Sequence, residues 1–146
     1  MSNRAIFWFR RDLRLSDNPA LLAAIEAGDE IVPVFILDPA LIKQAGTKRL
    51  AYLGNSLRAL DESLGNRLHV MVGDQAEVLN ELMKRYKATS VHISEEFEPY
   101  GAKRDARVEA AGIVLTRTGS PYAVSPGRVR KPSDGTPYKV YTPFYK

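Results

Sequence analysis

The sequence predicts a doubly wound α/β fold, in which five parallel strands form one Rossmann-like sheet and helices cover both faces. Two observations support this class. Five short apolar segments alternate along the chain with amphipathic segments of helical period. The first two segments are almost wholly apolar, which is typical of strands buried on both faces of a parallel sheet. Right-handed crossovers through the helices would then keep all five strands parallel.

The strands are expected at residues 5–9, 31–37, 68–72, 90–94 and 113–117. The last three mix polar residues with apolar ones. Pro33 lies inside the second segment, and a proline has no N–H group to donate to a neighbouring strand. We therefore expect Pro33 near a strand end or a bulge.

Helix signals stand between the strands. Asn18 is a candidate N-cap with Pro19 at the first helical position, and Gly28 is the expected left-handed end of that helix. A second helix ends at Gly65. It carries one apolar stripe at spacings of three and four, formed by Leu50, Leu53, Leu57, Leu60 and Leu64. A coiled coil uses the same spacing, but barely two heptads are present, so packing on the sheet is the better interpretation.

Two further helices complete the pattern. Asp74 followed by Glu77 resembles a capping box and predicts a third helix that reaches Tyr86. A fourth is expected over residues 100–112. The α/β domain then occupies residues 1–118. Residues 119–146 hold prolines and no regular period, so we expect an extended, loop-rich segment there.

Composition excludes several classes of site and partner. The chain has no cysteine, hence no disulfide and no thiolate metal site, and His69 and His92 are too few for a zinc site. No apolar run is long enough for a membrane helix, no secretory signal is evident at the N-terminus, and a cytoplasmic location is expected. The net charge of +4 lies in residues 119–146. This basic segment suggests an anionic partner or a solvated loop.

Charged residues follow the predicted strands at the edge where open parallel sheets bind ligands. Arg10 and Arg11 follow the first strand, Asp38 follows the second, and Glu96 follows the fourth. Guanidinium groups suit contacts with anionic groups and stacking on flat rings. The alternative is that these arginines pair with nearby carboxylates, including the acidic loop at residues 95–98.

Familiar catalytic motifs are missing. The loop after the first strand reads RRDLRLSDN and contains no G-x-G-x-x-G, no Walker lysine loop is present, and no serine lies in a G-x-S-x-G elbow. A standard dinucleotide, ATP or serine-hydrolase site is therefore disfavoured. No set of side chains suggests acid–base or nucleophilic catalysis.

Five motifs carry a family resemblance: FWFRRDLRLSDNPAL at residues 7–21, FILDPAL at 35–41, KRLAYLGNSLRALDESL at 48–64, EPYGAKRD at 98–105 and GTPYKVYTPFYK at 135–146. Together they resemble the N-terminal domain of the DNA photolyase and cryptochrome family. The resemblance covers essentially the whole chain in order. It is strongest to class I bacterial photolyases, which repair cyclobutane pyrimidine dimers.

The resemblance implies a division of labour. In this family the N-terminal α/β domain holds a light-harvesting antenna pigment, and a following helical domain binds FAD and damaged DNA. Residues 119–146 would include the start of the interdomain linker. The chain would then be part of a carbon–carbon lyase that lacks its catalytic FAD domain, and this fragment alone is not expected to repair DNA. Its expected partners are the pigment, its own C-terminal domain and, through the full-length protein, damaged DNA, with no membrane.

The resemblance also implies the pigment site. Arginines would hold anionic groups of the pigment, apolar side chains would flank its ring, and Glu96 would accept a proton from a ring or ribityl hydroxyl. The implied cofactor-binding residues are Arg10, Arg11, Phe35, Ile36, Asp38, Arg49, Leu53, Glu96 and Arg104.

Pigment choice follows from one local motif. Folate-using members resemble one another in an Asn-Glu pair before the Arg-Asp of the fourth helix, where this chain has Tyr100 and Gly101. Methenyltetrahydrofolate is therefore less favoured. The EPYG form is more similar to members that use the deazaflavin 8-HDF, followed by FMN or FAD. A pocket that holds no pigment is the remaining alternative.

Two other functions remain open from the sequence. One is a cryptochrome-type photoreceptor domain, which the residues present do not separate from a photolyase. The other is a nucleotide-binding α/β module like those of stress proteins and electron-transfer flavoproteins. A phosphate-binding glycine loop near the fourth strand would support that module, and none is evident.

Overall fold

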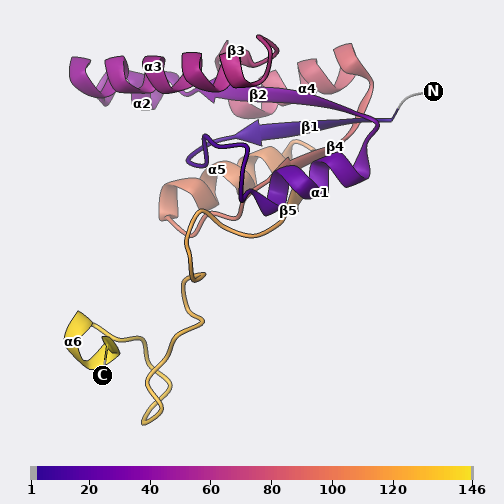
Figure 1. Cartoon of the computed structure of the whole chain (residues 1–146). Coiled ribbons are helices and arrows are strands. Elements are labelled where there is room, and N and C mark those ends of the chain that lie inside the picture. The colour runs from indigo at the N-terminus through magenta and orange to yellow at the C-terminus, as the bar shows by residue number, and fades with distance from the viewer. Residues whose placement is uncertain (1–2, 146) are drawn as a thin grey trace.

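The computed structural model describes residues 3–145 and confirms the predicted α/β class (Figure 1). One parallel sheet has the strand order β3-β2-β1-β4-β5. Its strands are β1 (Arg4–Phe9), β2 (Glu30–Leu37), β3 (His69–Val72), β4 (Ala88–Ile93) and β5 (Leu115–Arg117). The helices are α1 (Pro19–Ala27), α2 (Pro39–Gln44), α3 (Thr47–Ser63), α4 (Gln75–Tyr86), α5 (Pro99–Ala110) and α6 (Tyr141–Tyr145).

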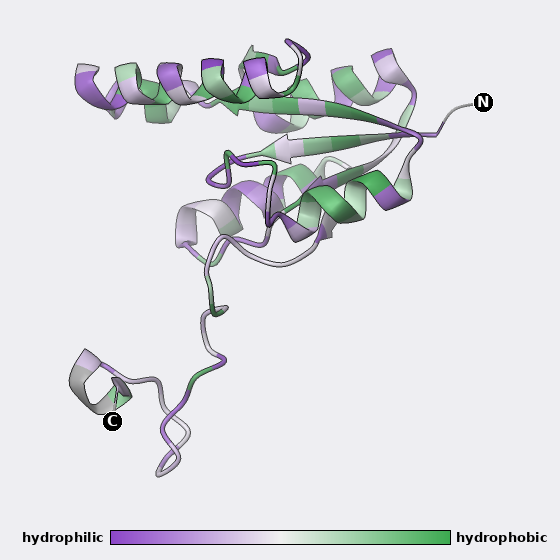
Figure 2. Ribbon diagram, in the orientation of Figure 1, coloured by the Kyte–Doolittle hydropathy of each residue, from purple (hydrophilic) through white to green (hydrophobic). Residues whose placement is uncertain are grey.

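Alternate side chains of the central strand β1 point into two separate cores. Ile6 and Trp8 pack in the larger core, to which α4 and α5 contribute. Phe7 and Phe9 lie on the opposite face with α1 and the C-terminal half of α3. Because β1 is covered on both faces, its residues are apolar at every position after Arg4, and Figure 2 shows most of the strand in hydrophobic green, with a paler stretch toward its arrowhead.

The helix starts follow the capping signals. Asn18 accepts a hydrogen bond from the backbone N–H of Leu21 at 3.2 Å, and Asp74 accepts from Ala76 at 2.9 Å, so both predicted N-caps are confirmed. Asp38 caps α2 in the same way, through the N–H of Ala40 at 2.8 Å. The sequence analysis did not predict this six-residue helix.

Two local expectations were wrong. Gly28 is extended, with φ −139° and ψ 147°, rather than left-handed. A Cβ there would lie only 3.0 Å from the backbone nitrogen of Ala5, so close approach to β1 explains the glycine.

Pro33 lies within β2, opposite Phe7 and not at a bulge, and pairing with β3 begins only at Val34. The side of β2 toward β3 is therefore open at Pro33, so its missing N–H interrupts no pairing with that strand.

Residues after β5 leave the α/β body as an extended segment, as Figure 1 shows. One short helix lies in this segment. Residues 141–145 form the short helix α6, where the rings of Tyr141 and Tyr145 stack at 5.7 Å. Within residues 3–145, no helix is both long and apolar enough to cross a membrane.

Candidate functional site

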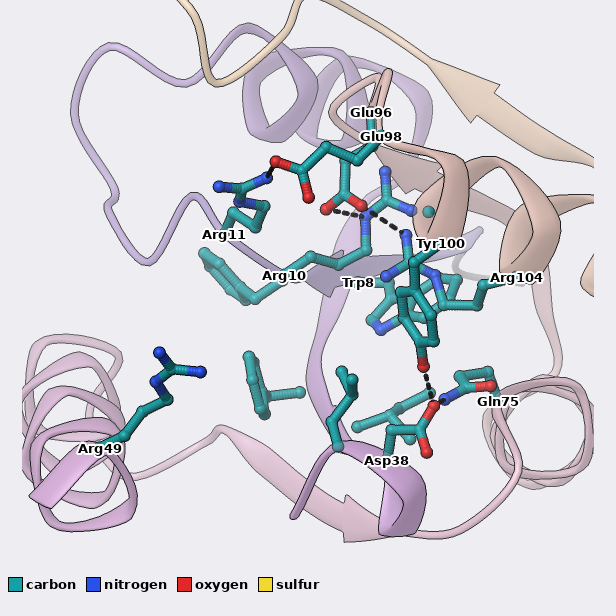
Figure 3. Close-up of a pocket in the computed structure, with 15 residues that line it drawn as sticks. Trp8, Arg10, Arg11, Asp38, Arg49, Gln75, Glu96, Glu98, Tyr100 and Arg104 are labelled. Atoms are coloured by element: carbon teal, nitrogen blue, oxygen red, sulfur yellow. Dashed lines mark hydrogen bonds and ion pairs between the residues drawn. The ribbon is translucent and has the colours of Figure 1, made fainter. Parts of the chain in front are cut away.

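A cavity of about 450 Å³ opens at the carboxyl ends of β1 and β2 (Figure 3). Strand β1 pairs with both β2 and β4, so the order of the strands reverses at β1 and the chain connections on its two sides run in opposite directions. Doubly wound sheets bind their ligands at such a point. The residues of the first cavity are Trp8, Phe9, Arg10, Arg11, Phe35, Ile36, Asp38, Leu41, Arg49, Gln75, Glu96, Glu98, Tyr100, Gly101 and Arg104.

All the predicted site residues except Leu53 line this first cavity. Leu53 lines an adjoining cavity of about 340 Å³, which shares five lining residues with the first: Phe35, Ile36, Asp38, Leu41 and Arg49. The structure therefore brings the predicted set to one hollow region, with Leu53 on its apolar side next to α3.

Trp8 forms part of the cavity wall beneath two cations. The guanidinium carbons of Arg10 and Arg104 lie 5.2 and 4.9 Å from the centre of its ring system. Trp8 is the single tryptophan of the chain and is 2% exposed. Guanidinium groups over an aromatic face gain cation–π attraction, so the ring helps to hold both arginines in place.

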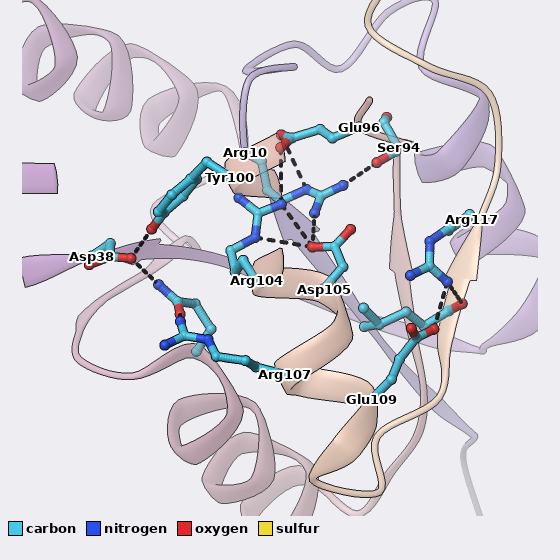
Figure 4. A network of polar contacts seen from close by, with 12 residues as sticks. Arg10, Asp38, Ser94, Glu96, Tyr100, Arg104, Asp105, Arg107, Glu109 and Arg117 are labelled. Carbon is cyan, nitrogen blue, oxygen red and sulfur yellow. Dashed lines mark hydrogen bonds and ion pairs between the residues drawn. The ribbon is translucent and has the colours of Figure 1, made fainter. Parts of the chain in front are cut away.

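The two arginines also belong to a buried ion-pair network, drawn in Figure 4. Arg10 donates to Asp105 at 2.7 Å and lies 3.6 Å from Glu96. Arg104 donates to the same carboxylates, at 2.9 Å to Asp105 and 3.1 Å to Glu96. Burial and the neighbouring Arg104 lower the pKa of Arg10, while the two carboxylates oppose that change.

The pairing of arginines with carboxylates, considered from the sequence as the alternative to ligand binding, is therefore present. Arg11 donates to Glu98 at the cavity mouth, and that hydrogen bond raises the pKa of Arg11. These pairs leave the cavity open, however. The ion pairs form its wall and do not fill it, so pairing and ligand binding are compatible here.

Arg49 differs from the other cavity arginines. It projects from α3 toward the cavity in Figure 3. Among residues 3–145, no carboxylate lies within 4.0 Å of its guanidinium, whereas Arg10, Arg11 and Arg104 all have acidic partners. Arg49 is thus a cation available to an anionic or electron-rich group of a ligand.

Tyr100 and Gln75 complete one side of the cavity, and the sequence analysis assigned neither to the site. The Tyr100 hydroxyl donates to the Asp38 carboxylate, which also accepts from Gln75 at 2.8 Å. Burial and the contact with Asp38 raise the pKa of Tyr100 to about 12. Burial alone would raise the pKa of Asp38, but the hydrogen bonds from Tyr100 and Gln75 outweigh it and the net pKa is lowered. The bond thus joins a neutral phenol to an ionised carboxylate.

Gly101 creates room for the acidic part of the network. A Cβ at Gly101 would run into Oε2 of Glu96 and would lie 3.1 Å from the Glu96 Cβ. No larger residue fits without moving Glu96 away from the arginines. The sequence signal for this requirement is the Tyr100-Gly101 pair, which was interpreted only in terms of pigment choice.

The comparisons with known proteins decide the family. The family model for DNA photolyase matches residues 5–146. The chain is 36% identical to a deoxyribodipyrimidine photo-lyase of Synechococcus sp., and the match covers the whole of this chain and 32% of that protein. It is also 40% identical to cryptochrome-1 of Macaca fascicularis, over 75% of this chain and 20% of that one. The chain belongs to the DNA photolyase family.

Two solved structures agree with this assignment. A class III photolyase from Agrobacterium tumefaciens matches with a TM-score of 0.84 and 33% identity, over 99% of this chain and 31% of that one. An archaeal photolyase from Sulfolobus tokodaii matches with a TM-score of 0.74 and 32% identity, over 85% of this chain and 31% of that one. The archaeal structure holds two FAD molecules and implicates a novel light-harvesting cofactor.

The expected family and fold are therefore confirmed. The chain spans about a third of the length of the photolyases that it matches.

Among the residues that the structure describes, no group of three or more His, Cys, Asp or Glu side chains is arranged to hold a metal ion. The site offers an aromatic wall, apolar side chains and arginines, which together suit an organic ligand with a flat ring.

Proposed function

We propose that the first cavity holds the light-harvesting pigment of a DNA photolyase that repairs cyclobutane pyrimidine dimers. The observation that carries this proposal is the gathering of the predicted pigment residues, all but Leu53, at one cavity together with Arg49, which has no carboxylate within 4.0 Å among residues 3–145. A bound pigment would absorb light and pass the excitation energy to a flavin elsewhere in the full-length protein.

The residues present fit such a ligand. Phe35, Ile36 and Leu41 supply apolar surface for a ring, while Leu53 extends that surface into the adjoining cavity. Energy transfer requires a fixed distance and orientation between pigment and acceptor, and a wall braced by buried ion pairs serves this requirement. Arg49 and the exposed part of Arg11 would contact the polar groups of the pigment.

The pigment that we propose is a deazaflavin of the 8-HDF type. FMN and FAD come next, and the FAD-containing archaeal relative supports a flavin-type ring in this family. Methenyltetrahydrofolate is less favoured because Tyr100 and Gly101 replace the Asn-Glu pair. Glu96 is 7% exposed and faces two arginines, so its proposed contact with a pigment hydroxyl would use an oxygen lone pair that those arginines leave available.

The full-length protein would supply the remaining parts. We propose that residues 119–146 lead toward a helical domain that binds FAD and damaged DNA, and that this chain contacts DNA only through that assembly. A cytoplasmic location belongs to the same proposal. The match to the DNA photolyase family favours this proposal over a stress-protein or electron-transfer module. A cryptochrome-type receptor remains the second candidate, supported by the 40% identity to cryptochrome-1.

Trp8 provides a direct test, because it is the single tryptophan and it lines the cavity. Titration with 8-HDF, FMN and methenyltetrahydrofolate should quench Trp8 fluorescence saturably, most tightly with 8-HDF. Arg49→Ala should weaken binding about tenfold, the usual effect of losing one charged contact. Arg58→Ala, on the same helix but outside the first cavity, is the matched control. Absence of saturable quenching with all three pigments would rule the proposal out for this protein.

A further inference from the structure

A second cavity lies directly behind the Tyr100 side of the first. Its volume is about 510 Å³. The two cavities share four lining residues, Asp38, Gln75, Tyr100 and Arg104. These residues therefore form the wall between the two hollows.

Hydrogen bonds join the side chains of Asp38, Gln75 and Tyr100 in this wall. Tyr100 from α5 donates to Asp38, which stands before α2, and Gln75 from α4 donates to the same carboxylate at 2.8 Å. Arg107, two turns further along α5, donates to Gln75 at 3.0 Å. The chain of contacts thus starts and ends on α5 and ties three helices together, as Figure 4 shows for the labelled side chains.

The second cavity is lined by three cationic side chains, Lys103, Arg104 and Arg107, and by the two carboxylates of Asp38 and Asp74, so cations outnumber anions there. Lys103 and Arg107 line it and do not line the first cavity. Lys103 has no carboxylate within 4.0 Å among the described residues, and Arg107 lies 4.0 Å from Asp74. The other side of this cavity includes Gly73 and Ala40, which present backbone and little side chain. It has room for a polar arm and no large apolar residues to bind a second hydrophobic ring.

We propose that the Tyr100–Asp38 hydrogen bond is a latch that sets the length of pigment the site accepts. Closed, it confines the ligand to the first cavity and selects compact pigments such as 8-HDF or FMN. Opened, it joins the cavities, and a flavin with a second nucleotide extends its anionic arm past Asp38 toward Lys103 and Arg107. This inference rests on the proposed pigment site.

The latch is suited to remain closed across the physiological pH range. The pKa of Tyr100 is raised to about 12 and that of Asp38 is lowered, so the donor keeps its proton and the acceptor keeps its charge. Tyr100 is nevertheless 40% exposed. It stands in the first turn of α5 and not in the core, so the opening that we propose is an outward turn of its ring.

The test compares compact and extended ligands by equilibrium dialysis in the dark. The proteins are the 146-residue wild type, Tyr100→Phe, Tyr100→Ala and the control Tyr52→Phe, which changes an exposed tyrosine outside both cavities. Wild type should bind 8-HDF or FMN more tightly than FAD. Tyr100→Phe keeps the ring and loses only the latch bond, so it should improve FAD binding relative to FMN about fivefold. Tyr100→Ala should improve that ratio by tenfold or more, and Tyr52→Phe should leave it unchanged.

Lys103→Ala supplies an independent readout of the second cavity. In the Tyr100→Phe background it should weaken FAD binding several-fold and leave FMN binding unchanged. Lys84→Ala, an exposed lysine of α4 outside both cavities, is its control.

The outcomes separate this inference from the function on which it rests. If 8-HDF or FMN binds but the FAD ratio stays at the wild-type value in both Tyr100 variants, the latch is wrong and the pigment site stands. If Lys103→Ala weakens FMN and FAD equally, the second cavity does not receive the arm. If no flavin or deazaflavin binds any of these proteins, the proposed pigment site and the proposed latch are both contradicted.

Discussion

The carboxylate of Asp105 accepts a hydrogen bond from the guanidinium of Arg10 at 2.7 Å, across 95 positions of sequence. This contact ties the end of the central strand to α5. Both side chains are 4% exposed, so neither charge is solvated by bulk water. Because Asp105 also accepts from Arg104, one carboxylate holds two of the cavity arginines.

Asp105→Asn should therefore be strongly destabilising. The substitution keeps the shape of the side chain but leaves Glu96 as the one carboxylate within 4.0 Å of the guanidiniums of Arg10 and Arg104 among the described residues. Breaking a buried pair costs about 3–5 kcal/mol, because an uncompensated charge remains in the interior. Urea denaturation followed by circular dichroism would measure the loss of unfolding free energy.

The control for this prediction lies on the same helix. Glu109→Gln removes the carboxylate partner of Arg117, which it contacts at 2.7 Å in a much more exposed pair. Exposed ion pairs contribute less than about 1 kcal/mol, so this variant should unfold close to wild type. Equal losses in the two variants would contradict the importance assigned here to burial.

Stability should fall as the pH drops below about 6.5, and His92 is a principal cause. Burial lowers the pKa of His92 from its ordinary 6.5, its ring is 4% exposed, and its Nδ1 has no hydrogen-bond partner among the described residues. The unfolded chain therefore binds a proton at higher pH than the folded protein. The unfolding free energy is unaffected well above pH 6.5 and decreases by up to about 1.4 kcal/mol per pH unit below it, until the folded pKa is reached.

Denaturation at several pH values between 7.5 and 5.5 would measure this slope. His92→Gln removes the titrating group and should flatten the profile. His69→Gln is the comparison, because burial and then Arg85 lower the pKa of His69 but its side chain is only partly buried. An unchanged slope in His92→Gln would show that other groups cause the acid sensitivity.

The fold was predictable because β1 and β2 are continuous apolar runs and because Asn18 and Asp74 are capping residues followed by amphipathic segments. The short helix α2 was missed for a physical reason. Asp38 was interpreted only as a site residue, although an aspartate followed by Pro39 is also a helix start. Helix propensities did not predict α6, because its five residues include a proline and have no apolar period.

The site was predictable only in part. Arg10 and Asp38 follow strands, so the sheet topology alone places them at the ligand edge. Which carboxylate each arginine contacts depends on distances between segments far apart in sequence, and no local pattern encodes the choice of Asp105. Trp8 was not predicted as a site residue; it is buried in the core and also lines the cavity. Tyr100 was missed because its role depends on Asp38 lying opposite.

Gly101→Ala should destabilise the protein and weaken pigment binding together. An added Cβ would run into the Glu96 carboxylate, which must then move away from Arg10 and Arg104. Overpacking of this kind costs about 1–3 kcal/mol, and the displaced Glu96 side chain would narrow the first cavity. Denaturation and the Trp8 titration measure the two effects separately.

Gly54→Ala is the matched control, because Gly54 is also helical and a Cβ there meets nothing within 4 Å. The same chemical change should stabilise α3 by about 0.5–1 kcal/mol, since alanine is the better helix former and restricts the unfolded chain. The two variants should therefore shift the unfolding free energy in opposite directions. If Gly101→Ala is as stable as Gly54→Ala and binds the pigment normally, Glu96 has another position available and does not brace the cavity as described.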